Sequence, residues 1–100
     1  MAAFYALLRV ELHFPDSGSL KAKRAHLNRI KAWLHERLGA TVSEVDHQDT
    51  WQRSTLAVAL TAGTEARCLD AVDEVARMLS EWDPVIERRV VSWADTEAIG

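Results

Sequence analysis

Apolar and polar side chains alternate near the start of the chain, over residues 4–14. The even positions from 8 onward are all large and apolar, namely Leu8, Val10, Leu12 and Phe14. A period of two predicts a β-strand with one buried face. Residues 41–47 and 52–62 are predicted as strands too, and the second of these turns three apolar side chains inward: Leu56, Val58 and Leu60.

In the last predicted strand, residues 85–94, apolar residues occur at both odd and even positions, so they do not define one buried face. Ile86 and Val90 compete with Val91 and Trp93 for the inward face. A β-bulge, which inserts one extra residue into a strand, is one explanation of such a conflict. The sequence therefore leaves the inward face of this strand open.

Two segments have a helical period instead. Residues 20–38 place on one stripe Leu20, Leu27, Ile30, Leu34 and Leu38, with Ser19 as the expected N-cap and Gly39 just past the end. Residues 65–82 form a second stripe with Cys68, Leu69, Val72, Val75, Ala76 and Leu79. The pair Asp83-Pro84 should stop this helix, because the residue before a proline avoids the helical region.

The predicted order is βαββαβ, which favours a ferredoxin-like α+β fold for residues 1–100 as a single domain. This fold has a four-stranded antiparallel sheet with two helices on one face. Right-handed crossovers place strand 52–62 between the first two strands. Three connections, at 13–19, 46–51 and 82–84, are then expected to meet at one end of the molecule.

Composition narrows the class of protein. The chain has 100 residues, of which 48% are hydrophobic and 27% charged, and its net charge is −3. These values are typical of a soluble globular protein, and no apolar run is long enough to cross a membrane. The single cysteine, Cys68, excludes an internal disulfide and a multi-cysteine metal site. We therefore expect a cytoplasmic protein that is not attracted to nucleic acid as a whole, so only a local patch could bind it.

Five polar residues are expected at the end where the connections meet: His13, Lys23, Asp46, His47 and Asp49. Nitrogen and oxygen ligands of this kind could bind a metal ion, but the spacing of a zinc site is missing, so we expect no metal and no cofactor. Lys23 lies near the apolar stripe of the first helix and must send its ammonium group toward this end. A structural ion pair with Asp46 or Asp49 is favoured over a binding role.

The charges on the two helices are segregated. Residues 20–38 hold six cations and one acid, whereas residues 64–83 hold six acids and two cations. Spacings of three and four put on one flank of the first helix Lys21, Arg24, Asn28, Lys31 and His35. This basic stripe is either a solvated face, partly paired with the second helix, or a surface for RNA or a ribosomal subunit. Trp51 and Arg53 are further candidates for the RNA surface.

The remaining aromatic and nucleophilic residues do not indicate a catalytic site or a base-stacking surface on the sheet. Trp33 and Trp82 are expected in the core, Trp93 in the sheet and Trp51 at the exposed turn. Cys68 and Ser54 are predicted to face inward, so no activated nucleophile is visible and we expect no enzymatic activity. The open face of the sheet should show Leu7, Arg9, Glu11, His13, Arg53, Thr55, Ala57 and Ala59. It lacks the aromatic platform that stacks RNA bases and suits a homo-oligomer interface instead.

Two stretches, LRVELHFPDSGSLKAKR (8–24) and EVDHQDTWQRSTLAVA (44–59), resemble the bacterial domain of unknown function 503, or YlxP-like, family. The resemblance implies a ferredoxin-like fold and no established activity. It also implies genes that often neighbour those for ribosome-binding factor A and translation initiation factor 2.

Our first hypothesis is a non-enzymatic cytosolic accessory of translation or ribosome assembly that binds RNA or a ribosomal subunit. The alternatives are a homo-oligomeric module without nucleic-acid binding, and a small enzyme or metal binder at Asp46, His47 and Asp49.

Overall fold

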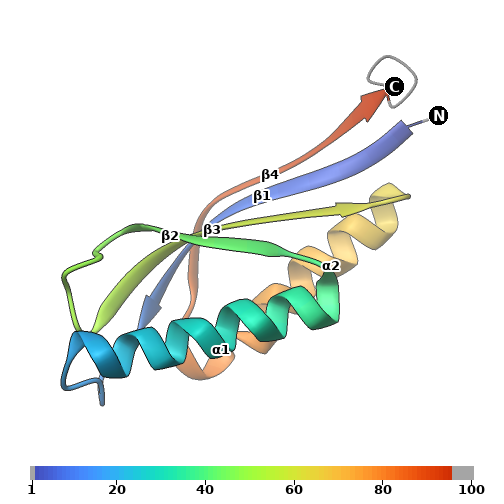
Figure 1. The fold of residues 1–100 in the computed structure, drawn as a ribbon. Helices are drawn as coiled ribbons and strands as arrows, with labels where there is room; N and C mark the ends of the chain where they lie inside the picture. Colours follow the sequence, from blue (N-terminus) through green and yellow to red (C-terminus); the bar gives the residue numbers. More distant parts are fainter. Residues whose placement is uncertain (1, 96–100) are drawn as a thin grey trace.

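The structure, a computed structural model, describes residues 2–95, and its elements follow the predicted order (Figure 1). The strands are β1 (Ala2–His13), β2 (Thr41–Asp46), β3 (Arg53–Ala62) and β4 (Val85–Asp95). The helices are α1 (Leu20–Leu38) and α2 (Glu65–Met78), and a short 3-10 helix, η1 (Ser80–Trp82), follows α2. The prediction of a ferredoxin-like α+β fold is confirmed.

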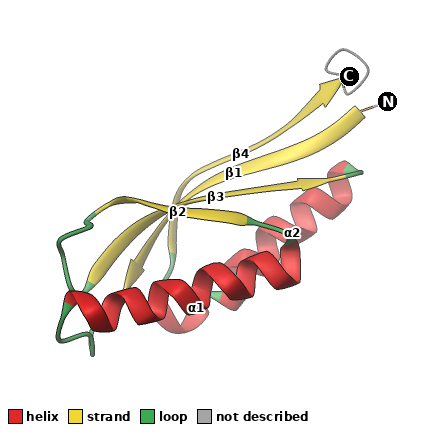
Figure 2. Cartoon of the chain, in the orientation of Figure 1, coloured by secondary structure: helices red, strands yellow, loops and turns green. Residues whose placement is uncertain are grey.

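The four strands form one antiparallel sheet in the order β2-β3-β1-β4, so β3 lies between β1 and β2 as predicted. Both helices cover the same face of this sheet (Figure 2). The paired outer ends of β1 and β4 lead away from the helices, and the molecule is elongated, at 48 × 23 × 23 Å. Among the described residues, no element covers the other face, which we call the open face.

The ends of α1 match the sequence prediction. The Ser19 side chain accepts a hydrogen bond from the backbone N–H of Ala22, at 3.1 Å, which satisfies one free donor of the first turn. Gly39 follows the last turn in the left-handed conformation, with φ of 65°.

The end of α2 differs from the prediction. The helix ends at Met78 rather than at residue 82, and η1 continues the chain. The chain tightens here to a 3-10 turn, in which the Trp82 N–H donates to the Leu79 carbonyl at 3.0 Å. Asp83 then takes a left-handed conformation, with φ of 47°, and Pro84 leads into β4. The pair Asp83-Pro84 correctly predicted where the helical segment ends. The spacing of apolar residues could not distinguish a last α-helical turn from a 3-10 turn.

The core lies between the helices and one face of the sheet. β1 and β3 contribute the predicted alternating residues, and each helix contributes a narrower stripe than predicted. Leu20, Leu38, Leu69 and Ala76 are only half-buried, at the margins of their stripes. The buried helical residues are Lys23, Leu27, Ile30 and Leu34 on α1, and Cys68, Val72, Val75 and Met78 on α2.

A bulge resolves the conflict in β4. The pairing of β1 with β4 shifts register between Arg9 and Val10, where Arg88 and Ile86 are the respective partners, so Glu87 is the extra residue. Ile86 before the bulge and Val91 after it both pack against the core. Val90 pairs with Leu7 and so faces the open side.

The predicted meeting of three connections at one end is also present. The backbone N–H of Phe14 donates to the Gln52 carbonyl at 2.9 Å, which joins the β1–α1 connection to the β2–β3 turn. Asp83, from the α2–β4 connection, lines a small groove together with His13, Pro15, Gln52 and Arg53. We call this region, residues 13–19, 46–53 and 82–84, the convergent end.

Candidate functional site

Lys23 fastens the β2–β3 turn to α1. Its side chain is only 1% exposed, and its ammonium nitrogen lies 3.0 Å from a carboxylate oxygen of Glu44. The same nitrogen donates to three backbone carbonyls of the turn, those of His47 (2.7 Å), Gln48 (3.3 Å) and Arg53 (3.3 Å). A buried ammonium group needs this set of acceptors, because burial without partners costs several kcal/mol.

The acid that pairs with Lys23 is not the one predicted. The sequence favoured Asp46 or Asp49, whereas the structure pairs Lys23 with Glu44. A register shift in β2 between Glu44 and Asp46 accounts for the difference. Glu44 lies opposite the core residue Leu56, so its carboxylate points beneath the sheet, where it also accepts a hydrogen bond from the Ser54 hydroxyl.

Asp46 and Asp49 lie on the outside of the turn. The Asp46 side chain is 58% exposed, and it accepts a hydrogen bond from the backbone N–H of His47 at 2.8 Å. Its nearest cation is Arg9, at 4.0 Å. Asp49 is exposed, and within residues 2–95 its side chain forms no hydrogen bond or ion pair. His47 has a positive φ of 62°, which the Lys23 contacts to the turn help to hold.

On the open face, Glu11 is the centre of a second polar cluster. Its carboxylate lies 3.4 Å from Arg53 and 3.8 Å from the His47 ring, and it accepts a hydrogen bond from the Thr55 hydroxyl at 3.3 Å. His13 is exposed near this cluster. In the described part of the chain, no three His, Cys, Asp or Glu residues come together as metal ligands. The carboxylates here are neighbours of cations, which is the arrangement of a structural charge network.

The basic stripe on α1 is exposed to solvent. Lys21, Arg24, Asn28 and His35 are exposed and Lys31 is partly exposed. None of its cations forms an ion pair within residues 2–95. The contact of α1 with α2 uses Arg37, whose guanidinium lies 3.2 Å from Glu74. At 100° per residue, Arg37 lies on the opposite flank from the stripe, so the predicted pairing of the stripe with the second helix does not occur.

The structure brings only part of the predicted RNA surface together. Trp51 is 51% exposed in the β2–β3 turn, whose His47 and Gln48 carbonyls bind Lys23 of α1. Arg53 lies on the open face in its pair with Glu11, on the other side of the sheet from the stripe. Lys21, Arg24 and Lys31 therefore remain as one candidate surface on α1, Trp51 lies on the β2–β3 turn, and Arg53 is on the open face.

The tryptophans on the helical side are packed less deeply than predicted. Trp82 is partly buried in a cluster with Phe14 and His26, with ring centroids 6.4 and 6.5 Å away. Trp33 is 41% exposed and lines a groove with Trp82, so its assignment to the core is wrong. At about 100° per residue, Trp33 lies about 60° to one side of Ile30, at the margin of the buried stripe.

The candidate nucleophiles are buried as predicted. Cys68 is fully buried, and desolvation together with the nearby Glu65 carboxylate raises the pKa of its thiol. A protonated, inaccessible thiol is a poor nucleophile. The Ser54 hydroxyl is buried and donates to Glu44, which is itself paired with Lys23.

Comparisons with known proteins agree with the fold and define the family. The class of the structure is the ferredoxin-like α+β fold. A crystal structure of a protein described as a putative chlorite dismutase, TA0507, superposes with a TM-score of 0.69 at 13% identity over 98% of this chain. The chain spans only 46% of that protein. The de novo designed protein Foldit4 superposes with a TM-score of 0.50 at 11% identity, over 93% of this chain and 97% of the design.

Sequence similarity is more specific. The family described as "Protein of unknown function (DUF503)" matches residues 5–92, and the chain belongs to this family. The uncharacterized protein YlxP of Bacillus subtilis (strain 168) is 33% identical over 75 residues, which cover 75% of this chain and 80% of that protein.

No helix in residues 2–95 is long and apolar enough to span a bilayer.

Proposed function

We propose that this protein is a non-enzymatic, cytoplasmic accessory of translation or ribosome assembly, and that it binds RNA, free or on a ribosomal subunit, through the basic stripe of α1. The observation that carries the proposal is the position of the stripe. Lys21, Arg24 and Lys31 lie side by side on the flank of α1 that is turned away from α2. Exposed cations in a row can neutralise the phosphates of a nucleic-acid backbone.

The charge distribution of the whole chain supports this orientation. The net charge is −3, and the segment that contains α2 carries most of the acids of the helical layer. A polyanion is repelled from that side and attracted to the α1 flank. Trp51, exposed on the turn that Lys23 joins to α1, offers a flat apolar surface on which an unpaired base could stack.

The test is binding of a variant in which Lys21, Arg24 and Lys31 are all changed to Glu. Exposed charges contribute little to stability, so this variant should fold like the wild type. We expect co-sedimentation with ribosomal subunits and binding to RNA to weaken strongly. The slope of log affinity against log salt should fall by up to about one unit for each phosphate that the variant no longer neutralises.

The matched control changes Arg67, Arg77 and Arg89 to Glu, which alters the net charge equally on the α2 side. These three arginines are exposed, and two of them form ion pairs, Arg77 with the partly buried Glu74 and Arg89 with Asp73. If the control loses as much binding as the stripe variant, the effect is one of net charge only. If the wild type binds no RNA and no subunit at low salt, the proposed function is wrong.

A further inference from the structure

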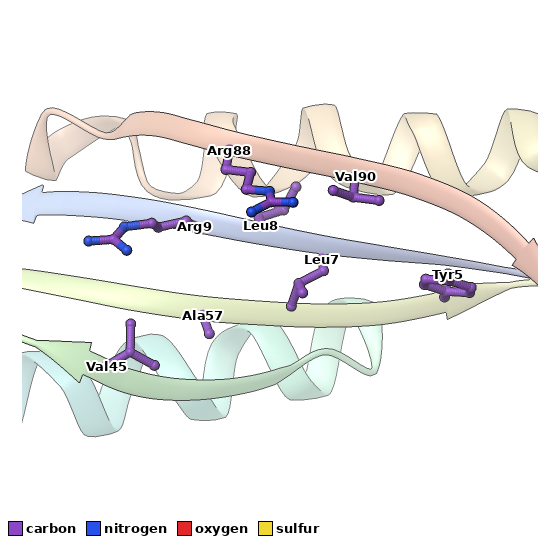
Figure 3. A pocket seen from close by; sticks show the side chains of 8 residues that line it. All are labelled: Tyr5, Leu7, Leu8, Arg9, Val45, Ala57, Arg88 and Val90. Carbon is purple, nitrogen blue, oxygen red and sulfur yellow. The ribbon is translucent and has the colours of Figure 1, made fainter.

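The open face of the sheet carries a continuous apolar patch, which we call the open-face patch: Tyr5, Leu7, Val45, Ala57 and Val90. Figure 3 views it with both helices behind the sheet, and every strand contributes a side chain. Leu7 is 50% exposed and Val45 is 47% exposed. The patch lines an open groove, with Arg9 and Arg88 at its border.

The exposed hydrophobic side chains are concentrated on this face. Seven large hydrophobic residues in the described chain are exposed, and four of them lie here, namely Tyr5, Leu7, Val45 and Val85. Val45 shares the open-face parity of Thr41 and Ser43, and the β2 bulge at Val45 brings Asp46 to the same face, opposite Thr55. A contiguous apolar patch on a small soluble protein indicates an interaction surface.

The charges around the patch balance one another. Three cations and three carboxylates reach this face: Arg9, Arg53, Arg88, Glu11, Asp46 and Glu87. Arg9 lies 3.0 Å from Glu87, and Arg53 lies 3.4 Å from Glu11. A face without net charge does not attract a polyanion such as RNA. It can, however, meet an identical face without repulsion, although the chain as a whole is negative.

The size of the face suits a dimer. With about 3.3 Å per residue and about 4.8 Å between strands, the four strands cover roughly 600 Å² in projection. Side-chain relief makes the accessible area larger than this projection. A specific interface buries about 800 Å² per partner, so an identical face would provide the area that a stable contact needs.

We propose that a second copy of this chain packs its open face against this one, sheet against sheet, in a two-fold symmetric dimer. Leu7, Ala57 and Val90 form the dry centre of the interface, and the ion pairs of Arg9 and Arg53 form its polar rim. The α1 stripe lies on the other side of the sheet. The dimer therefore leaves both stripes free, and the proposal does not depend on RNA binding.

The experiment is sedimentation equilibrium of the full chain over a range of concentrations. The wild type should show a mass of twice 11.2 kDa. Leu7→Glu places a charge in the dry centre and should raise the dimer dissociation constant roughly tenfold or more. Trp33→Glu is the control, because Trp33 is a similarly exposed hydrophobic residue on the helical side. Circular dichroism reports whether each variant is folded.

If Leu7→Glu fails to fold, Ala57→Arg on the neighbouring strand β3 replaces it. This variant too should raise the dimer dissociation constant. A wild type that is monomeric at every attainable concentration overturns the proposal. So does a wild-type dimer that both open-face variants leave intact, since its interface is then elsewhere. Equal weakening by Trp33→Glu overturns it too.

Discussion

Lys23 is a charged residue that behaves as part of the core. Its alkyl chain occupies the buried stripe of α1, and its ammonium group supports a turn 24 or more positions along the chain. Removing one partner of a buried pair costs more than the pair contributes, because the remaining charge loses its counterion. The residue therefore links the start of α1 to the whole convergent end.

Lys23→Met should lower the free energy of unfolding by about 3 kcal/mol, since Glu44 and the three turn carbonyls lose their donor. Urea denaturation measures this change. Lys21→Met, two positions away and exposed, is the control and should change stability by less than about 0.5 kcal/mol. Combining Lys23→Met with Glu44→Gln should recover part of the loss. Equal stability of the Lys23 and Lys21 variants would contradict the structural role.

Asp49→Ala should have almost no effect on stability, less than about 0.5 kcal/mol, because Asp49 is exposed on the outside of the turn. The sequence interpretation, which paired Asp49 with Lys23, predicts a loss of about 1 kcal/mol or more. Urea denaturation of this variant beside Glu44→Ala distinguishes the two. A larger loss in the Asp49 variant would favour the original pairing.

At the scale of elements, helix ends and bulges decide which residues share a face. Ser19 and Gly39 set the ends of α1, and the bulges in β2 and β4 reverse the parity of each edge strand. The β4 bulge turns Val90 to the open face, and the β2 bulge turns Asp46 to it. The β4 bulge thus supplies one apolar residue of the open face, and the β2 bulge supplies one of its charges.

Gly39→Ala should destabilise the protein by about 1 kcal/mol, because an L-residue is strained at the φ of 65° found here. Gly63→Ala is the matched control, since Gly63 has no positive φ and an added Cβ meets no neighbour within 4 Å. Thermal melts of the two variants should differ in this direction. Equal melting temperatures would mean that the α1 terminus relaxes at no cost.

Glu74 joins the two helices by pairing with Arg37 on α1 and Arg77 on α2. The hydrogen bond from Arg77, followed by that from Arg37, lowers the pKa of the Glu74 carboxyl from 4.5. A lowered pKa stabilises the fold above 4.5, and this stabilisation disappears as the pH falls through the folded-state pKa. Glu74→Gln should therefore melt slightly earlier than the wild type at neutral pH, and the gap should close as the pH falls below 4.5. Glu36→Gln, exposed and outside the described ion pairs, should show no such pH-dependent gap.

At the scale of the whole molecule, the two proposed surfaces lie on opposite sides of the sheet (Figure 2). The helical layer carries the basic stripe, and the open face carries the neutral apolar patch. Because the surfaces share no residue, each can be removed without altering the other. A substitution that removes the function of one surface should therefore leave the function of the other unchanged.

The stripe variant should remain a dimer while it loses RNA binding, and Leu7→Glu should become monomeric while it keeps its affinity for a short RNA. On a longer RNA that spans both protomers, Leu7→Glu should bind more weakly than the wild type, because two linked stripes raise the effective concentration. Parallel sedimentation and RNA-binding measurements test this. If Leu7→Glu also loses short-RNA binding, the two surfaces are not independent.

Much of the architecture follows from the sequence alone. The strict alternation in 4–14 and 52–62, the helical period in 20–38, and the residues Ser19 and Gly39 predicted elements that the structure contains. Handedness and short connections then left one strand order. The stripe of Lys21, Arg24 and Lys31 also follows from helical spacing, because spacing of three and four fixes a flank without reference to the rest of the fold.

The partner of Lys23 and the composition of the open face were decided by tertiary structure. Val42 and Glu44 share a parity, so the inward position of Glu44 could have been predicted from the alternation in β2. The β2 bulge, which turns Asp46 to the open face and away from Lys23, leaves no comparable signal. Bulges depend on how an edge strand pairs with its neighbour. The sequence of one strand therefore determines its period, whereas pairing in the sheet determines where that period is interrupted.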